Sequence, residues 1–250
     1  MGEFAGKVVM VTGGSKGIGR AAVHRFCEEG ATCIIVSRHG DECRHYAAEL
    51  AAMGHKAGGL AADVSSVGDI KGMVQSAIAQ HGRIDVLVNA AGISNRKMAV
   101  DYTEEDWDQI IDINLKGAYF CCLAVGKQMI SQGGGTIVNI ASLQSHITLP
   151  ALSIYAASKA GVRQFTKGLA NEWAPLGIRV NSISPAFIET AMVEKVLQNP
   201  VNRQLLESRT PLKRAGTPGE VAELILFLAS PRSSYITGAD IPIDGGWTAS

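Results

Sequence analysis

The chain has 250 residues, of which 46% are apolar and 18% are charged, a composition that is typical of a globular protein and excludes a disordered one. Its 23 Lys and Arg residues balance 23 Asp and Glu residues, so the charge gives no indication of a surface for nucleic acid or for an anionic membrane. No apolar run approaches the ~18–20 residues of a membrane span, and the N-terminal residues lead into a strand-like run without the pattern of a signal peptide, so we expect neither membrane insertion nor export.

The cysteine and histidine patterns indicate a reducing compartment and no metal site. The chain has five cysteines, an odd number, and no Cys-x-x-Cys motif. Its six histidines are scattered without the spacing of a zinc motif. We therefore expect free thiols in a cytoplasmic protein that holds no metal.

Short apolar runs alternate with longer helix-like segments along the whole chain. Strands are predicted over residues 8–12, 31–37, 56–62, 84–89, 136–141, 179–184 and 239–243. Helices are predicted after the first strand, over residues 41–53, 66–81, 103–131 and 154–173, and from a capping box at residues 217–220. No linker or repeat interrupts this alternation, which predicts one doubly wound α/β domain of the Rossmann type over residues 1–250, with a parallel seven-stranded sheet flanked by helices on both faces.

A glycine-rich turn follows the first predicted strand. Gly13, Gly17 and Gly19 have the spacing G-x-x-x-G-x-G, and a helix-like segment begins at once. Glycines let a backbone approach a pyrophosphate closely, and the N-terminus of the helix supplies N–H groups and the positive end of its dipole. The position of this turn in a βαβ chain therefore predicts dinucleotide binding, although such a turn can also serve packing alone.

The end of the second predicted strand bears on the choice between NADP(H) and NAD(H). Sites that prefer NAD carry an acid about 20 residues past the glycines, where it binds the ribose 2′-hydroxyl. Here that position has Ser37 and Arg38, and Lys16 lies inside the glycine turn, although Asp41 follows closely. Two cations near the ribose suit the additional phosphate of NADP(H), so we favour this cofactor, with NAD(H) as the alternative.

Tyr155 and Lys159 lie four residues apart in a helix-like segment, so they share one face of a helix, one turn apart. A nearby ammonium lowers the pKa of a phenol, which is otherwise about 10. Ser142 comes earlier, at the end of a predicted strand, where its hydroxyl can lie opposite that helix. The three groups supply a donor, a tunable acid/base and a cation, as proton transfer to a carbonyl or alcohol oxygen needs, whereas the alternative is a surface Tyr–Lys pair.

Together these residues resemble the short-chain dehydrogenase/reductase family, and the resemblance covers the whole chain. The matching segments are TGGSKGIG at residues 12–19, Asp63-Val64, Asn89-Ala90-Ala91-Gly92, Asn114, the set Ser142, Tyr155 and Lys159, residues 185–190, and Asp244-Gly245-Gly246. Two positions depart from the family pattern, because Ala90 replaces an Asn and Ala186 replaces a Gly. The second departure lies in the loop expected at the nicotinamide.

The resemblance implies an NAD(P)-dependent oxidoreductase that interconverts a secondary alcohol and a ketone by hydride transfer. It implies that Tyr155 transfers the proton, that Ser142 holds the substrate oxygen, and that Lys159 binds the nicotinamide ribose and lowers the pKa of the tyrosine. Asn114 would hold a water that joins Lys159 to solvent, unless it only bonds its own helix. The cofactor-binding residues implied are Gly13, Ser15, Lys16, Gly17, Ile18, Gly19, Ser37, Arg38, Asp63, Val64, Asn89, Ala90, Gly92, Tyr155, Lys159, Pro185, Ile188 and Thr190.

Substrate contacts are expected from the segment after Ser142, from the loop after the Asn-Ala-Ala-Gly motif and from an insertion over about residues 186–212. Gln144 and His146 could hydrogen-bond a polar substrate, and Arg96 could bind a carboxylate. All three could equally be solvated loop residues.

Two local segments favour a sugar acid or polyol as the small-molecule substrate. The strings ANEWA at residues 170–174 and DGGWTAS at residues 244–250 resemble family members such as gluconate 5-dehydrogenases. The alternatives are a 3-oxoacyl-[acyl-carrier-protein] reductase and a broad-range carbonyl reductase. A module that binds NADPH without catalysis, as a sensor or scaffold, is disfavoured because the whole set of catalytic residues is present. The family also implies a homotetramer built from the helices over residues 103–131 and 154–173 and the last strand.

Overall fold

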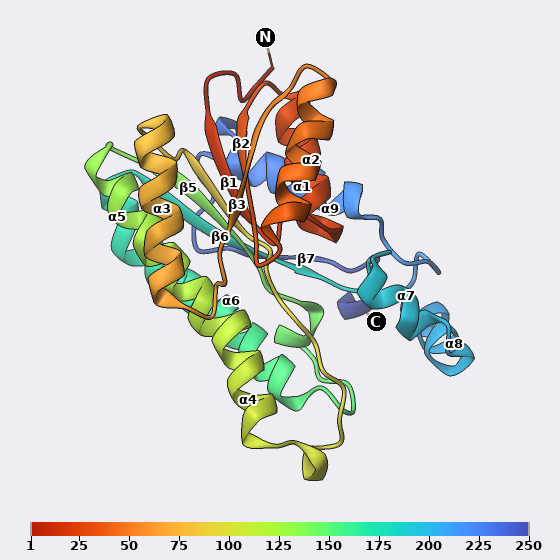
Figure 1. Ribbon diagram of the computed structural model, residues 1–250. Helices are drawn as coiled ribbons and strands as arrows, with labels where there is room; N and C mark the ends of the chain where they lie inside the picture. Colours follow the sequence, from red (N-terminus) through yellow and green to blue (C-terminus); the bar gives the residue numbers. More distant parts are fainter. Residues whose placement is uncertain (1, 250) are drawn as a thin grey trace.

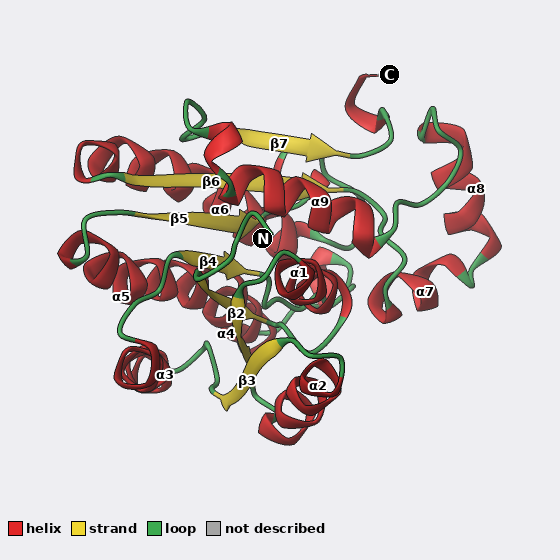
Figure 2. Ribbon diagram, turned by 90° about the horizontal axis from the view of Figure 1, so that it is seen from above, coloured by secondary structure: helices red, strands yellow, loops and turns green. Residues whose placement is uncertain are grey.

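A seven-stranded parallel sheet forms the centre of the molecule in the computed structural model, which describes residues 2–249 apart from the side chains of residues 192 and 195. The strands lie in the order β3-β2-β1-β4-β5-β6-β7 (Figure 2). They are β1 (Val8–Thr12), β2 (Thr32–Ser37), β3 (Lys56–Ala61), β4 (Val86–Asn89), β5 (Gly135–Ile140), β6 (Ile178–Pro185) and β7 (Asp240–Ile243). Every neighbouring pair in this order is parallel, which confirms the predicted doubly wound α/β fold.

Helices cover both faces of the sheet. One face carries α1 (Gly17–Glu28), α2 (Gly40–Ala52) and α9 (Pro218–Ala229), and the other carries α3 (Val67–His81), α5 (Ala118–Ser131) and α6 (Ser153–Trp173) (Figures 1 and 2). Each face buries its own apolar cluster, one of which includes Phe26 and the other Met129. Because both faces are covered, β1 consists of a run of residues that are all buried.

The helical segment predicted over residues 103–131 consists of three parts. α4 (Glu104–Ile111) begins at a capping box in which Thr103 and Asp106 bond each other's backbone N–H groups. A π-helical turn over Asp112–Gly117 follows, and α5 completes the segment. At Gly117 a Cβ atom would lie 2.4 Å from the carbonyl oxygen of Val64, so the helix passes the neighbouring loop more closely than a side chain allows. Turns of this kind recur at functional sites, and this one carries Asn114.

The sheet reverses its direction of growth between β1 and β4, and in folds of this kind the ligand crevice lies at such a point. The chain adds β2 and β3 on one side of β1, and β4 to β7 on the other. Thr12 and Asn89 are paired where the two strands end. The turn after β1 and the loop after β4 therefore meet at one edge of the sheet.

The predicted insertion over about residues 186–212 forms two short helices beyond the end of β6. They are α7 (Ala191–Leu197) and α8 (Pro200–Arg209), and they project away from the sheet in both views (Figures 1 and 2). The helix α9 then begins at a second capping box, between Thr217 and Glu220, as predicted. Among the helices within residues 2–249, none is both long enough and apolar enough to cross a membrane.

Candidate active site

A cavity of about 440 Å³ lies where the turn after β1 meets the loops that follow β2, β4, β5 and β6. Most of the residues that the sequence predicts for the site line this cavity. They are Gly13, Ser15, Lys16, Gly17, Ile18, Gly19, Ser37, Arg38, Asp63, Val64, Ala90, Gly92, Ser142, Tyr155, Lys159, Pro185, Ile188 and Thr190. Segments from most of the chain's length therefore meet in one place.

The glycine turn leaves room that any side chain would fill. Gly13 has a φ of +66°, and a Cβ atom there would lie 2.8 Å from the backbone nitrogen of Ala91. At Gly19 a Cβ atom would lie 2.3 Å from the carbonyl oxygen of Gly13. The first residues of α1 line the cavity beside this turn, so the N-terminus of the helix lies at the cavity. This combination fits a pyrophosphate.

The part of the cavity beside β2 carries two cations and an acid. Lys16 and Arg38 line it as predicted, and Glu42 from the first turn of α2 lines it too. Lys16 Nζ donates a hydrogen bond to Glu42 Oε1 over 2.8 Å, and this bond is the main reason that the pKa of Glu42 is lowered. Asp41, the acid that the sequence singled out, is instead fully exposed and pairs with an arginine of its own helix.

Ser142 lies just beyond the end of β5, at the start of a short 3₁₀ turn. Its Oγ atom accepts a hydrogen bond from the backbone N–H of Gln144 over 3.2 Å. The hydroxyl also lies close enough to the phenol of Tyr155 to act on it, in the direction that lowers the pKa of the tyrosine. The side chain of Ser142 is therefore oriented by its own backbone turn and aimed at α6.

Tyr155 and Lys159 lie one turn apart on α6, as predicted, and both line the cavity. Lys159 Nζ donates to the carbonyl oxygen of Ile140 over 2.8 Å and lies 5.9 Å from the centroid of the Tyr155 ring. Burial lowers the pKa of Lys159 to about 8. Burial also raises the pKa of Tyr155, against the effect of Ser142. Burial is thus the main influence on the pKa of Tyr155, and a lowering of that pKa by Lys159 stays a prediction.

Two predicted residues, Asn89 and Asn114, lie just outside the cavity. The side chain of Asn114 accepts the N–H of Ile93 over 2.8 Å, and its amide donates to the carbonyl oxygen of Ile93 and to the hydroxyl of Ser158. These bonds tie the loop after β4 to α6. Within the sheet, the amide of Asn89 donates to Asn139 over 2.9 Å. A role for Asn114 in a proton relay stays a prediction.

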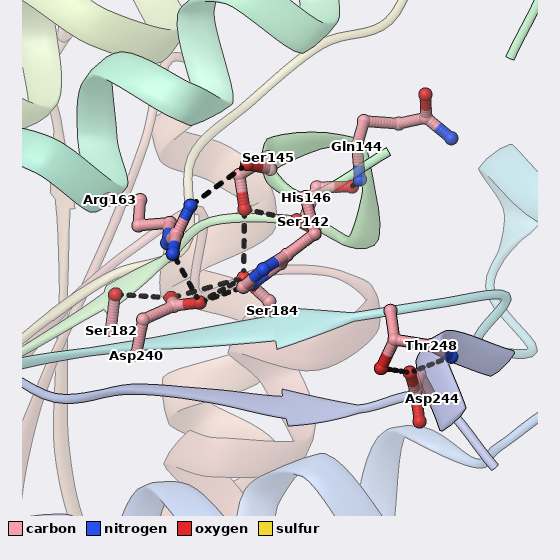
Figure 3. A network of polar contacts seen from close by, with 10 residues as sticks. All are labelled: Ser142, Gln144, Ser145, His146, Arg163, Ser182, Ser184, Asp240, Asp244 and Thr248. Atoms are coloured by element: carbon pink, nitrogen blue, oxygen red, sulfur yellow. Dashed lines mark hydrogen bonds and ion pairs between the residues drawn. The ribbon is translucent and has the colours of Figure 1, made fainter. Parts of the chain in front are cut away.

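The three residues predicted to bind substrate do not line the cavity. Gln144 is buried, and its Oε1 atom accepts the N–H of Leu149 over 3.0 Å. His146 turns toward β7, where its Nε2 atom lies 2.6 Å from Asp240 (Figure 3). Arg96 is exposed on the loop after β4. Contacts from these three residues to a substrate stay a prediction.

The chain is similar to known proteins over nearly its whole length. A family model described as "Enoyl-(Acyl carrier protein) reductase" matches residues 13–248. The chain is 44% identical to the 3-oxoacyl-[acyl-carrier-protein] reductase FabG of Thermotoga maritima, with 98% of each chain covered. It is 38% identical to the D-threitol dehydrogenase of Mycolicibacterium smegmatis, with 97% of this chain and 93% of the relative covered. A gluconate 5-dehydrogenase from Burkholderia cenocepacia, crystallised in complex with NADP and tartrate, superposes with a TM-score of 0.96 at 32% identity, over 99% of this chain and 97% of that one.

Replacing Lys159 by Met is expected to change how stability depends on pH. The pKa of Lys159 is about 8 in the folded protein and 10.5 ordinarily. Between these values the unfolded state binds more protons, so the free energy of unfolding of the wild type rises with pH. In urea unfolding, the free energy of unfolding of the wild type should rise by about 2 kcal/mol relative to that of Lys159→Met between pH 7 and pH 10.

The exposed Lys71 on α3 gives the matched control, because Lys71→Met removes the same charge from the surface. This control should show no such gain. A difference in free energy between wild type and Lys159→Met that stays constant from pH 7 to pH 10 would contradict the effect of burial on Lys159.

Proposed function

This chain belongs to the short-chain dehydrogenase/reductase family, and we propose that it interconverts a secondary alcohol and a ketone of the sugar-acid or polyol class, with NADP(H) as its favoured cofactor. Membership of the family makes it an oxidoreductase of the alcohol/ketone type that acts on a small molecule with a nicotinamide cofactor. The observation that carries the proposal is the meeting of Ser142, Tyr155 and Lys159 in the cavity that the glycine turn also lines.

Tyr155 is proposed as the acid/base. In ketone reduction its phenol donates a proton to the carbonyl oxygen, and in alcohol oxidation its phenolate takes the hydroxyl proton. The raised pKa of Tyr155 keeps the phenol protonated at neutral pH, which suits donation to a ketone. In alcohol oxidation the same raised pKa makes the rate rise with pH as the phenolate forms.

Ser142 and Lys159 support that proton transfer from two sides. The Ser142 oxygen already accepts the N–H of Gln144, so its own proton is available to the substrate oxygen. One N–H of the Lys159 ammonium goes to Ile140, which leaves two donors for the ribose hydroxyls of the cofactor and for a water-linked relay beside Asn114. A Cβ atom at Gly92 would lie 3.4 Å from Lys159 Nζ, so only a small residue there keeps this space open.

The cofactor is proposed to lie along the cavity, and when bound it supplies or accepts the hydride. The glycine turn and the N-terminus of α1 hold the pyrophosphate in this proposal, and Asp63 and Val64 lie at the adenine. The residues proposed for the nicotinamide end are Ala90, Gly92, Pro185, Ile188 and Thr190.

The preference for NADP(H) rests on Lys16 and Arg38, which both line the cavity, and on Ser37 at the position where an acid would select NAD(H). Glu42 opposes this preference, because its carboxylate holds the ammonium of Lys16. A 2′-phosphate has to draw Lys16 away from Glu42, so we propose that the discrimination against NAD(H) is incomplete.

The sugar-acid or polyol class is supported by the names of two similar proteins, the D-threitol dehydrogenase and the gluconate 5-dehydrogenase. The second candidate is reduction of a 3-oxoacyl thioester, which the 44% identity to the Thermotoga maritima reductase favours. The insertion over about residues 186–212 is proposed to contact the substrate within one catalytic domain over residues 1–250, since Ala191 and Val193 of α7 line the cavity.

We further propose a cytoplasmic homotetramer. Trp107 on α4 and Tyr119 on α5 are large exposed apolar residues on the helices that the family uses for association. The proposal of a cytoplasmic protein is supported by the five cysteines, which are free thiols and all buried, as is usual in a reducing compartment. Sedimentation velocity tests the assembly, and a monomer would contradict it.

The reaction is tested by following nicotinamide absorbance with gluconate, D-threitol, 5-ketogluconate and a short 3-oxoacyl thioester, each with both nicotinamide cofactors. We expect turnover of the sugar acid or polyol with NADP(H). Tyr155→Phe should lower kcat about 10³-fold, because the variant has no group that can exchange the proton. Its Kd for NADPH, measured by fluorescence, should stay within about twofold of the wild type.

Tyr235→Phe is the control for this variant, because Tyr235 is fully exposed. It should turn over substrate at the wild-type rate. Turnover of the thioester alone would assign the chain to the acyl reductases, and a Tyr155→Phe variant as active as the wild type would overturn the role of Tyr155.

The role of Glu42 is tested with Glu42→Gln, which keeps the shape of the side chain and removes its charge. Lys16 is then free to meet a 2′-phosphate, so the Kd for NADPH should fall about threefold at low salt while the Kd for NADH changes little. The matched control is Glu49→Gln, because Glu49 lies on the same helix in an ion pair with Arg20 and does not line the cavity. Weaker binding of NADH to Glu42→Gln, with NADPH unchanged, would show instead that Glu42 binds the ribose hydroxyls of NAD(H).

A further inference from the structure

Asp240 is a carboxylate that lies almost wholly inside the protein, although it stands at the first position of the edge strand β7. Its side chain is only 4% exposed. The hydroxyls of Ser182 and Ser184 on β6 donate hydrogen bonds to it, and His146 Nε2 lies 2.6 Å from it (Figure 3). Burial of a charge costs free energy unless partners surround it, so this set of contacts calls for an explanation beyond closing the sheet.

The partners of Asp240 lead directly to the turn that carries Ser142. Ser145 Oγ donates to the carbonyl oxygen of Ser142 over 2.5 Å and lies 3.0 Å from Ser184 Oγ, which in turn contacts Asp240. His146, the next residue, forms the second connection (Figure 3). The turn therefore has Ser142 at its start and two links to Asp240 at its end.

Asp240 is also linked to the helix that carries Tyr155 and Lys159. Arg163 follows Lys159 by one further turn of α6, so the three side chains lie along one side of the helix. Arg163 Nη1 donates to the carbonyl oxygen of Ser145 over 3.3 Å, and its Nε atom lies 3.7 Å from Asp240. The groups that face Asp240 are thus the imidazole of His146 from the turn and the guanidinium of Arg163 from α6, while β6 contributes two hydroxyls.

We propose that Asp240 is a positioning residue that, through His146, Ser184 and Arg163, fixes the hydroxyl of Ser142 relative to Tyr155. This inference rests on the proposed function, in which both hydroxyls meet one substrate oxygen. A displacement of about 1 Å in such a pair can cost about 100-fold in rate, so a carboxylate that joins the Ser142 turn to α6 affects the reaction without touching the substrate. It also explains why His146 turns away from the cavity.

A purely structural role for Asp240 predicts a different result. If the carboxylate only holds β7 to β6, its loss lowers stability and leaves the turnover of the folded protein unchanged. If it positions Ser142, its loss also moves the Ser142 hydroxyl away from Tyr155. That hydroxyl lowers the pKa of Tyr155, so moving it away raises the pKa further. The pH dependence of turnover therefore separates the two roles.

The test compares Asp240→Asn with Asp85→Asn, in full-length protein and with the alcohol that the wild type oxidises best. Asp85 is a matched control, because it is a nearly buried carboxylate that accepts the N–H of Val8 and pairs with Lys7 and Arg83. It lies just before β4, at the opposite end of the strands from the cavity. Both variants lose a buried carboxylate, but only Asp240 is linked to the turn that carries Ser142.

Asp240→Asn should lower kcat about tenfold or more, with the Kd for NADPH within about twofold of the wild type. The pH at which alcohol oxidation reaches half its maximum should also move upward. Asp85→Asn should keep the wild-type kcat and pH profile even if its melting temperature falls. His146→Gln and Ser184→Ala each remove one link and keep the carboxylate, and they should show the same two changes at smaller size, so they carry the test if Asp240→Asn does not fold.

A wild-type kcat and pH profile in Asp240→Asn, or in both smaller variants, would overturn the inference, as would an equal loss of kcat in Asp85→Asn. In the double variant of His146→Gln and Asp240→Asn, kcat should be no lower than in Asp240→Asn alone, because both changes break one connection. Tyr155→Phe, assayed alongside, separates this inference from the proposed function. If Tyr155→Phe is inert and Asp240→Asn resembles the wild type, only the inference fails, whereas full activity in Tyr155→Phe means that the function itself was assigned wrongly.

Discussion

The buried ammonium of Lys159 is the constraint on which the site depends. It lies at the C-terminal end of β5, where it donates a hydrogen bond to the carbonyl oxygen of Ile140. A charged group at that depth is costly, and the cost appears as a pKa lowered to about 8. The bond to Ile140 fixes α6 against the sheet, and this in turn sets where Tyr155 stands. Gly92 in the loop after β4 leaves space beside the ammonium, so the same contact that holds the helix also keeps a cation at the cavity.

The parts of the site that the sequence predicted are those encoded by short spacings. The glycine turn follows β1 directly, and Tyr155 and Lys159 need only the repeat of a helix to come together. The alternation of apolar runs likewise predicted the strand and helix segments, because strands buried on both faces read as continuous apolar runs. The sequence does not predict the π-helical turn at Asp112–Gly117, which passes close to Val64, a neighbour that only the folded chain brings near.

The features that the sequence did not predict depend on contacts between distant segments. Asp41 and Glu42 are adjacent acids, and only the start of α2 decides which of them reaches Lys16. The position of His146 shortly after Ser142 makes it a candidate substrate residue, and the sequence does not show that its partner Asp240 comes from the last strand. The raised pKa of Tyr155 has a related origin, since the depth of burial is a property of the whole fold. In each case the residue type was visible, and the neighbour that determines its behaviour was not.

The proposed reaction transfers a hydride between the carbinol carbon of a secondary alcohol and a nicotinamide, while Tyr155 accepts or donates the proton. The most direct measurement uses an alcohol substrate that carries deuterium on its carbinol carbon, with the oxidised cofactor, and follows the label by NMR. Direct transfer predicts one deuterium at C4 of the nicotinamide for each ketone formed, with none of the label released to water. Ketone formation with protium from solvent at C4, or with the label lost to water, would contradict it.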